Sequence, residues 1–262
     1  MLIDSHCHLD FPQLAADETG VLARARTAGV AGMLTIGTRL DQFDGVRAIA
    51  ERHANVWCSV GVHPHEAKEE GQRTPDRLVE ATRHPKVIGI GETGLDFYYE
   101  HSPRAEQAES FRSHIAAARQ TGLPLIVHTR DADRETGDIL EEEYAKGPFP
   151  GLIHCFSSGP GLARRALDLG LYISISGIVT FKAAEDLRAL VRELPIDRLL
   201  VETDAPYLAP VPKRGKTNEP AFVAHTAAKV AELKGIDLAA LERATTENFF
   251  RLFAKAERRA CE

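Results

Sequence analysis

Two histidines, His6 and His8, are separated by one residue and directly follow the apolar run at residues 2–4. Side chains two residues apart in a strand point to the same side of it. Both imidazole rings can therefore reach one metal ion, while Cys7 points the other way into a helix layer. Because imidazole nitrogen is a common ligand of divalent metals, the HCH sequence predicts part of a metal site.

Similar residues follow other short apolar runs of the chain. They are His63, Glu92, His128, His154 and Asp204. A single histidine at such a place is often a surface residue or a satisfied core residue. Several strand ends that each supply His, Glu or Asp predict instead one metal site shared between strands. Four other histidines are expected to be ordinary surface residues: His53, His84, His101 and His114.

The elements that must position these residues are eight short runs rich in Val, Ile or Leu, each shorter than a typical helix. They lie at 2–4, 30–36, 56–62, 86–91, 123–127, 151–153, 171–176 and 198–202. Between them, Ser102-Pro103 predicts a helix start and Gly122 its end, and Asn218-Glu219-Pro220 predicts another start before Gly235.

Eight strand–helix alternations without a linker predict an α/β fold with a single (β/α)8 TIM barrel, one domain over residues 1–262. Active sites of such barrels lie at the carboxyl ends of the strands, which is where the metal site is expected. A doubly wound open sheet is the alternative, because the pattern alone does not show closure.

The composition narrows the class of protein. The chain is 44% hydrophobic and 27% charged with a net charge of -6, which argues against a generally basic nucleic-acid coat but allows a local basic patch. It has no bilayer-spanning apolar run and no signal segment at its start. Four scattered cysteines without CxxC spacing indicate reduced thiols. We expect a cytoplasmic protein with no membrane partner, as a monomer or weak oligomer.

Seven motifs occur along the chain, from residue 3 to about residue 250: HCHLD, GVHPH, GETGLDF, VHTRDA, HCFSSG, VETDAPYLAP and NEPAFV. With these motifs the chain resembles the TatD family of metal-dependent deoxyribonucleases, which belong to the amidohydrolase-like barrels. The resemblance covers nearly the whole chain. It implies a (β/α)8 barrel and metal-assisted hydrolysis of phosphodiester bonds in DNA.

The resemblance also implies a role for each donor at a centre of two divalent ions, Mg²⁺, Mn²⁺ or Zn²⁺. The first ion would be bound by His6, His8 and Asp204, the second by His128 and His154, and both by Glu92. The catalytic residues would be Glu92 and Asp204, with Asp204 as the general base. Glu202 is expected to orient a ligand histidine, and a buried ion pair with Lys or Arg is the alternative.

Other residues are expected to bind the substrate. His63 would contact a substrate phosphate rather than a metal, with a loop hydrogen bond beside Pro64 as the alternative. Cationic contacts to nucleic acid are expected from Arg130 and from the loop after the last strand, which carries Lys213, Arg214 and Lys216. That loop could also be merely solvated. Three aromatic residues could stack on a base or pack on the barrel rim: Phe97, Tyr98 and Tyr99.

The expected function is therefore a divalent-metal-dependent hydrolase, a deoxyribonuclease that acts as a 3′–5′ exonuclease by a two-metal mechanism. The alternative is a metal-dependent hydrolase of a carboxylic ester or amide, such as an aminoacyl ester on transfer RNA. A third class, a metal-binding protein without catalysis, is disfavoured because the donor set and Asp204 are complete.

Overall fold

The computed structural model describes residues 1–69 and 75–261. Eight parallel strands form one sheet whose order follows the chain from β1 to β8. They are β1 (Leu2–Cys7), β2 (Val30–Thr35), β3 (Val56–Val60), β4 (Val87–Asp96), β5 (Leu125–Arg130), β6 (Gly151–Ile153), β7 (Tyr172–Ile175) and β8 (Leu199–Val201). Each of the eight apolar runs forms a strand, so the barrel prediction is confirmed.

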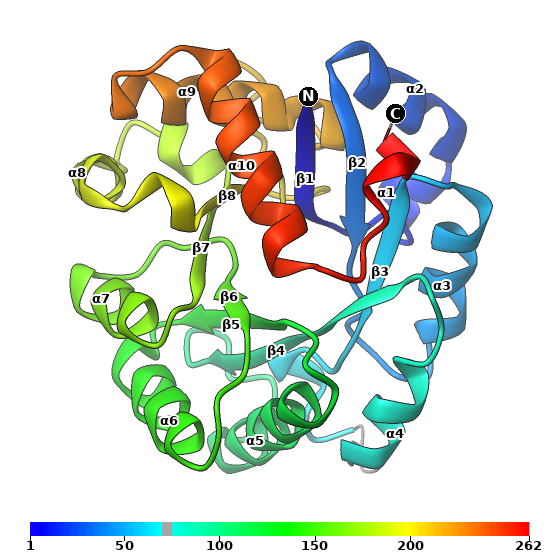
Figure 1. Ribbon diagram of the computed structural model, residues 1–262, viewed down its shortest axis with the longest axis vertical. Helices are drawn as coiled ribbons and strands as arrows, with labels where there is room; N and C mark the ends of the chain where they lie inside the picture. Colours follow the sequence, from blue (N-terminus) through cyan, green and yellow to red (C-terminus); the bar gives the residue numbers. More distant parts are fainter. Residues whose placement is uncertain (70–74, 262) are drawn as a thin grey trace.

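Helices surround the strands (Figure 1). They are α1 (Pro12–Ala15), α2 (Glu18–Thr27), α3 (Phe43–Arg52), α4 (Pro75–Ala81), α5 (Arg104–Thr121), α6 (Asp133–Ala145), α7 (Pro160–Asp168), α8 (Glu185–Glu193), α9 (Val223–Lys234) and α10 (Leu238–Leu252). Among the described residues, no helix is long and apolar enough to cross a membrane.

The first and last strands meet at the carboxyl end of the sheet. Cys7 forms a parallel bridge with Ala205, just after β8. The amide of Asp204 donates to the carbonyl of His6 at 2.9 Å, and the amide of His8 donates to the carbonyl of Ala205 at 2.8 Å. A doubly wound sheet has a non-sequential strand order and no such closure. That alternative is therefore wrong.

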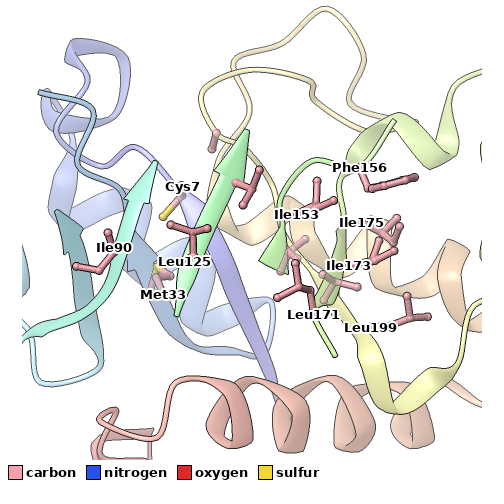
Figure 2. Close-up of a cluster of buried hydrophobic side chains, with 14 of the residues drawn as sticks. Cys7, Met33, Ile90, Leu125, Ile153, Phe156, Leu171, Ile173, Ile175 and Leu199 are labelled. Carbon is pink, nitrogen blue, oxygen red and sulfur yellow. The ribbon is translucent and has the colours of Figure 1, made fainter. Parts of the chain in front are cut away.

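Apolar side chains fill two separate layers. The outer cluster lies between strands and helices and includes Cys7, which confirms that this cysteine faces away from the barrel axis. Figure 2 shows strand residues of this cluster, among them Met33 and Ile173. The inner cluster fills the barrel at the amino ends of its strands and includes Ile3 and Trp57.

Helix α10 covers the amino ends of the strands and completes the inner cluster. Phe249 and Phe253 belong to that cluster, and the Phe249 ring lies 5.6 Å from the ring of Trp57. Figure 1 shows α10 crossing the barrel rather than joining the surrounding helices. The amino group of Met1 pairs with Glu242 of this helix at 2.6 Å. Apolar packing therefore fills one end of the barrel, and the carboxyl end is left for polar side chains.

The helix signals are largely confirmed, but two expectations from the sequence are wrong, one about Ser102 and one about His114. Gly122 and Gly235 end α5 and α9 in the left-handed conformation, as expected. Ser102 does not cap α5, because the N-cap position is Pro103 and the Ser102 hydroxyl accepts the amide of Lys68 at 3.1 Å while it donates to the carbonyl of His65 at 2.7 Å. His114, expected at the surface, is fully buried in α5, where its Nε2 accepts the amide of Val62 at 2.9 Å.

The GETG sequence gives β4 an irregular path beside β5. The register shifts between Ile90 and Thr93, and Gly91 and Gly94 have φ angles of 139° and 140°. A Cβ atom at Gly94 would lie 2.0 Å from the carbonyl oxygen of His128, so only glycine fits this contact. Both strands continue beyond their apolar runs, so Glu92 and His128 lie within strands rather than after them.

Replacing Gly94 by alanine should destabilise the fold by roughly 1–3 kcal/mol or more, because the new methyl group meets backbone and the φ angle is unfavourable. Urea unfolding of the parent and the variant measures this loss. Gly45→Ala is the matched control, since nothing lies within 4 Å of its Cβ position in α3. That variant should be neutral or more stable by up to about 1 kcal/mol. Equal stability of Gly94→Ala and the parent would contradict the prediction.

Candidate metal centre

The carboxylate of Glu92 is buried at the carboxyl mouth, and its two oxygens face different groups of histidines. Oε2 lies 3.3 Å from Nε2 of His6 and 3.9 Å from Nε2 of His8. Oε1 lies 2.7 Å from Nε2 of His154 and 2.9 Å from Nδ1 of His128. One carboxylate thus contacts donors from β1 on one side and from the β5–β6 region on the other.

Asp204 joins the group on the β1 side. Its Oδ1 lies 3.7 Å from Nε2 of His6 and 3.5 Å from Nε2 of His8. The backbone pairing at the closure of the barrel holds these three residues together. Within the described part of the chain, neither ring nitrogen of His6, nor Nδ1 of His8, has a hydrogen-bond partner of suitable geometry, although all three atoms are buried.

His154 is oriented by a second buried carboxylate. Its Nδ1 lies 3.3 Å from Oε1 of Glu202, which also accepts the amide of Cys155 at 2.7 Å. An Nδ1–H that donates to Glu202 leaves the Nε2 lone pair directed at the site. Glu202 therefore orients a candidate ligand as expected, and among the described residues its partners include no Lys or Arg.

Asp96 favours the opposite tautomer for a metal-binding His128. Its Nε2 lies 3.1 Å from Oδ2 of Asp96, so Nε2–H donates and the Nδ1 lone pair faces Glu92. The same Asp96 oxygen lies 3.0 Å from Nε2 of His65. Asp96 and His65 belong to the site, although the sequence-based prediction does not include them.

A spacing signal would have found His65 directly, and Asp96 once β4 is known to continue past its apolar run. Glu92, Gly94 and Asp96 alternate along one strand, so their side chains share a face. His63 and His65 repeat the His-x-His spacing of the first strand. The sequence-based prediction takes only the first polar residue after each of two runs, His63 and Glu92. It therefore omits the second polar residue of each segment.

His63 lies beside Glu92 rather than at the outer rim. Its Nε2 is 3.4 Å from Oε1 of Glu92, and its Nδ1 accepts the amide of His65 at 3.1 Å. Burial lowers the pKa of His63 to about 4. In the neutral ring, an accepting Nδ1 leaves the proton on Nε2, which makes that atom a hydrogen-bond donor. This geometry suits contact with an anionic oxygen.

The buried charges favour a cation at the centre. Burial alone would raise the pKa of Glu92, but His154, His63 and His6 hold it well below its ordinary value. Burial also opposes the charged form of His154, yet Glu92 and Glu202 raise its pKa well above the usual value. Carboxylates that draw a proton onto a buried imidazole also favour a metal cation at the same place.

A cavity of about 760 Å³ opens above these donors. Its walls include Arg130, Tyr99, His101 and Tyr207, so His101 is not an ordinary surface residue. Lys213, Arg214 and Lys216, all in the described part of the chain, do not line the cavity. Lys213 lies over the ring of Phe222 and Arg214 over the ring of Phe181, at 5.2 Å and 3.9 Å from the ring centres.

The residues present fit a centre for divalent metal. Three sets of donor atoms each lie within 4.8 Å of one another: His6, His8 and Glu92; His63, Glu92 and His128; His6, His154 and Glu202. Divalent ions bind to histidine nitrogens and carboxylate oxygens. This site has buried histidine nitrogens without hydrogen-bond partners, together with several carboxylates whose negative charge a cation would balance. A parallel eight-stranded barrel with these donors at its carboxyl mouth defines a metal-dependent barrel hydrolase.

Comparison with known proteins identifies the family. The model of the family described as TatD related DNase matches residues 3–254, and the chain belongs to this family. It is 45% identical to YcfH of Escherichia coli (strain K12), described as an uncharacterized metal-dependent hydrolase, over 96% of this chain and 95% of that one.

Two further relatives extend this comparison. The chain is 38% identical to a protein named 3′-5′ ssDNA/RNA exonuclease TatD from Enterobacter lignolyticus (strain SCF1), covering 97% of this chain and 100% of that one. The crystal structure of YjjV, a TatD homologue from Escherichia coli K12, superposes with a TM-score of 0.90 at 30% identity. That match covers 97% of this chain and 98% of the other.

Asp96→Asn should weaken metal binding roughly 10–100-fold, as expected when the partner of a ligand histidine is removed. An amide in this position cannot accept from both rings and still accept the amides of Tyr98 and Tyr99. The proton of His128 would then move toward Nδ1, the atom that faces Glu92. Calorimetric titration of the metal-free protein with Zn²⁺ or Mn²⁺ measures the change.

Asp131→Asn removes the same charge from an exposed neighbouring position and is the matched control. It should bind metal as the parent does. An equal loss of affinity in both variants would show that net charge, rather than the tautomer of His128, controls metal binding.

Proposed function

We propose that this protein is a deoxyribonuclease that hydrolyses phosphodiester bonds at 3′ ends with two divalent ions, Mg²⁺, Mn²⁺ or Zn²⁺. The observation that carries the proposal is the Glu92 carboxylate, whose two oxygens face two groups of histidines. In this assignment His6, His8 and Asp204 would hold one ion, His128 and His154 would hold the other, and Glu92 would serve both. Ions held in this way supply an activated water and offset charge on phosphoryl oxygens.

The residues of the chain supply the remaining steps. Asp204 lies beside His6 and His8, where its carboxylate accepts the proton of the attacking water. His63 donates from Nε2 to a phosphoryl oxygen, which follows from the contact of its Nδ1 with the amide of His65. Glu202 and Asp96 keep His154 and His128 in the tautomers that the assignment needs.

The substrate class is supported by the walls of the cavity and by one relative. Arg130 lies in the wall, where its guanidinium can pair with a phosphate next to the scissile bond. The exonuclease name of the relative from Enterobacter lignolyticus agrees with a polynucleotide. DNA as the partner and a cytoplasmic location are parts of the same proposal.

Digestion of single-stranded oligonucleotides labelled at the 5′ end, with Mg²⁺, Mn²⁺ or Zn²⁺, tests this function. The parent should shorten them stepwise from the 3′ end. Asp204→Asn should be at least about 100-fold slower, because the general base is removed. Calorimetry should show that this variant still binds metal, since the other donors are intact. Undiminished digestion by Asp204→Asn would exclude Asp204 as the base.

An aminoacyl ester on transfer RNA serves as the second substrate in this assay. The alternative hydrolase of esters or amides predicts turnover of the ester and no digestion of DNA with any of the three metals. That result would overturn the nuclease proposal while the metal centre stands.

The basic loop is proposed to contact the nucleic acid outside the cavity. Replacing its three cations, Lys213, Arg214 and Lys216, by alanine should weaken DNA binding and flatten its salt dependence. For each phosphate that a cation no longer neutralises, the slope of log affinity against log salt falls by roughly one unit. Hydrolysis of a dinucleotide, which is too short to reach the loop, should be unchanged.

The matched control replaces three exposed arginines at the opposite end of the barrel: Arg243, Arg251 and Arg259. It removes the same charge and should leave the salt slope as in the parent. Equal slopes for the parent and the loop variant would mean that the loop is only solvated and that DNA follows the side of Arg130.

A further inference from the structure

Exposed aromatic side chains collect at the mouth of the barrel. Among the described residues, large apolar side chains with high exposure are few, and three of them are Tyr98, Tyr99 and Tyr207. Tyr98 and Tyr99 are 57% and 51% exposed. Tyr99 and Tyr207 line the cavity above the metal donors. Rings left in water at the edge of a charged cavity suggest a ligand that covers them.

Tyr98 and Tyr99 form one surface with Arg130. The guanidinium of Arg130 lies 3.9 Å from the ring centre of Tyr98 and 4.8 Å from that of Tyr99. The two rings are 4.7 Å apart and nearly perpendicular. Strand register explains the contact, because Arg130 at the end of β5 pairs with Asp96 at the end of β4. We name these three residues, Tyr98, Tyr99 and Arg130, the aromatic rim.

The aromatic rim is fixed to the metal centre through one side chain. Oδ1 of Asp96 accepts the amides of Tyr98 and Tyr99 at 3.1 Å and 2.9 Å. Oδ2 of the same carboxylate lies 3.1 Å from Nε2 of His128. The rim is therefore held next to the donors that would bind the metal.

Phe97 shows the contrasting behaviour of an aromatic residue used for packing. It is partly buried against the outer cluster, and Arg104 lies over its ring at 4.1 Å. Tyr98 and Tyr99 also contact side chains, since Arg130 lies over both rings and the His101 ring stacks on Tyr99 at 5.5 Å, yet more than half of each tyrosine stays exposed. Packing on the barrel therefore explains Phe97 and leaves the two tyrosines unexplained.

We propose that the aromatic rim is a stacking site for an unpaired nucleobase beside the metal centre. Aromatic rings and the planar guanidinium offer faces on which any base can stack, while Arg130 also attracts the backbone. A base inside a duplex has both faces covered by its neighbours, whereas an unpaired base offers a free face to the rim. This inference rests on the proposed nuclease function and names the side chains that receive the base.

Binding measured by fluorescence anisotropy tests the stacking site. The probe is a 5′-fluorescein oligonucleotide of ten deoxythymidines, compared with one that has abasic nucleotides at its three 3′-terminal positions. Both are titrated with Mg²⁺-loaded protein that carries Asp204→Asn, so that the probe is not consumed. This Asp204→Asn protein, with its aromatic rim intact, is the parent in the comparison. It should bind the probe with bases roughly 5–100-fold more tightly than the abasic probe.

The variant Tyr98→Ala/Tyr99→Ala should lose this preference and bind both probes alike. Tyr98→Phe/Tyr99→Phe keeps the rings and should retain the preference. Leu238→Ala, an exposed apolar residue of α10, is the matched control and should behave as the parent. Because both tyrosines are more than half exposed, these variants should fold as the parent does.

Two outcomes overturn the stacking site while the nuclease proposal stands. One is a protein that cuts oligonucleotides with Asp204 intact but, as its Asp204→Asn form, binds both probes equally. The other is an alanine variant that weakens both probes by the same factor, which would mean that the rings serve only to position Arg130. A parent that neither binds nor cuts any oligonucleotide would overturn the nuclease function itself, and the stacking site with it.

Discussion

Two backbone hydrogen bonds between the end of β1 and the segment after β8 hold the candidate site together. They set Asp204 beside His6 and His8, residues from opposite ends of the chain. A buried contact lies deeper in the same seam, where Asp4 accepts the amide of Thr203 at 2.9 Å. Burial raises the pKa of Asp4 to about 8, which favours its neutral form. An open sheet would separate these groups by its full width.

The electrostatics of the mouth follow from that closure. Glu92 is surrounded by histidines from β1, the segment after β3, β5 and the segment after β6, and two of these rings, His128 and His154, are each oriented by another carboxylate. Glu202 and Asp96 set opposite tautomers in His154 and His128, so that Nε2 of one ring and Nδ1 of the other face the same Glu92 oxygen. Positive charge is needed at the centre of this arrangement. Among the described residues that line the cavity, the one Lys or Arg is Arg130, which lies over the rim tyrosines instead.

The sequence was sufficient for the strands and for the approximate positions of the donors. Short runs rich in Val, Ile or Leu mark every strand, and polar residues at their ends converge as the barrel geometry requires. Closure could not be derived in the same way, because it depends on contacts between distant segments. The burial of His114 could have been predicted from the sequence, because His114 lies on the same helical face as Phe111 and Ala118.

Other features depended on tertiary contacts that periodicity does not encode. The basic loop was expected to point its cations at the substrate, but the side chains of Lys213 and Arg214 fold onto Phe222 and Phe181. The role of Asp96 required knowing that β4 continues past its apolar run. The two glycines with positive φ in GETG make that continuation possible.

The position of α10 at the amino ends of the strands determines the face of the molecule from which a tether at either end of the chain would leave. The N-terminus pairs with α10, and the last described turn, Arg258–Cys261, lies near β2, so both ends leave from the face opposite to the cavity. Figure 1 shows the two ends on the same side of the barrel as α10. A tether at either end, such as a surface linker or a fused label, would orient every molecule with its mouth toward the solution.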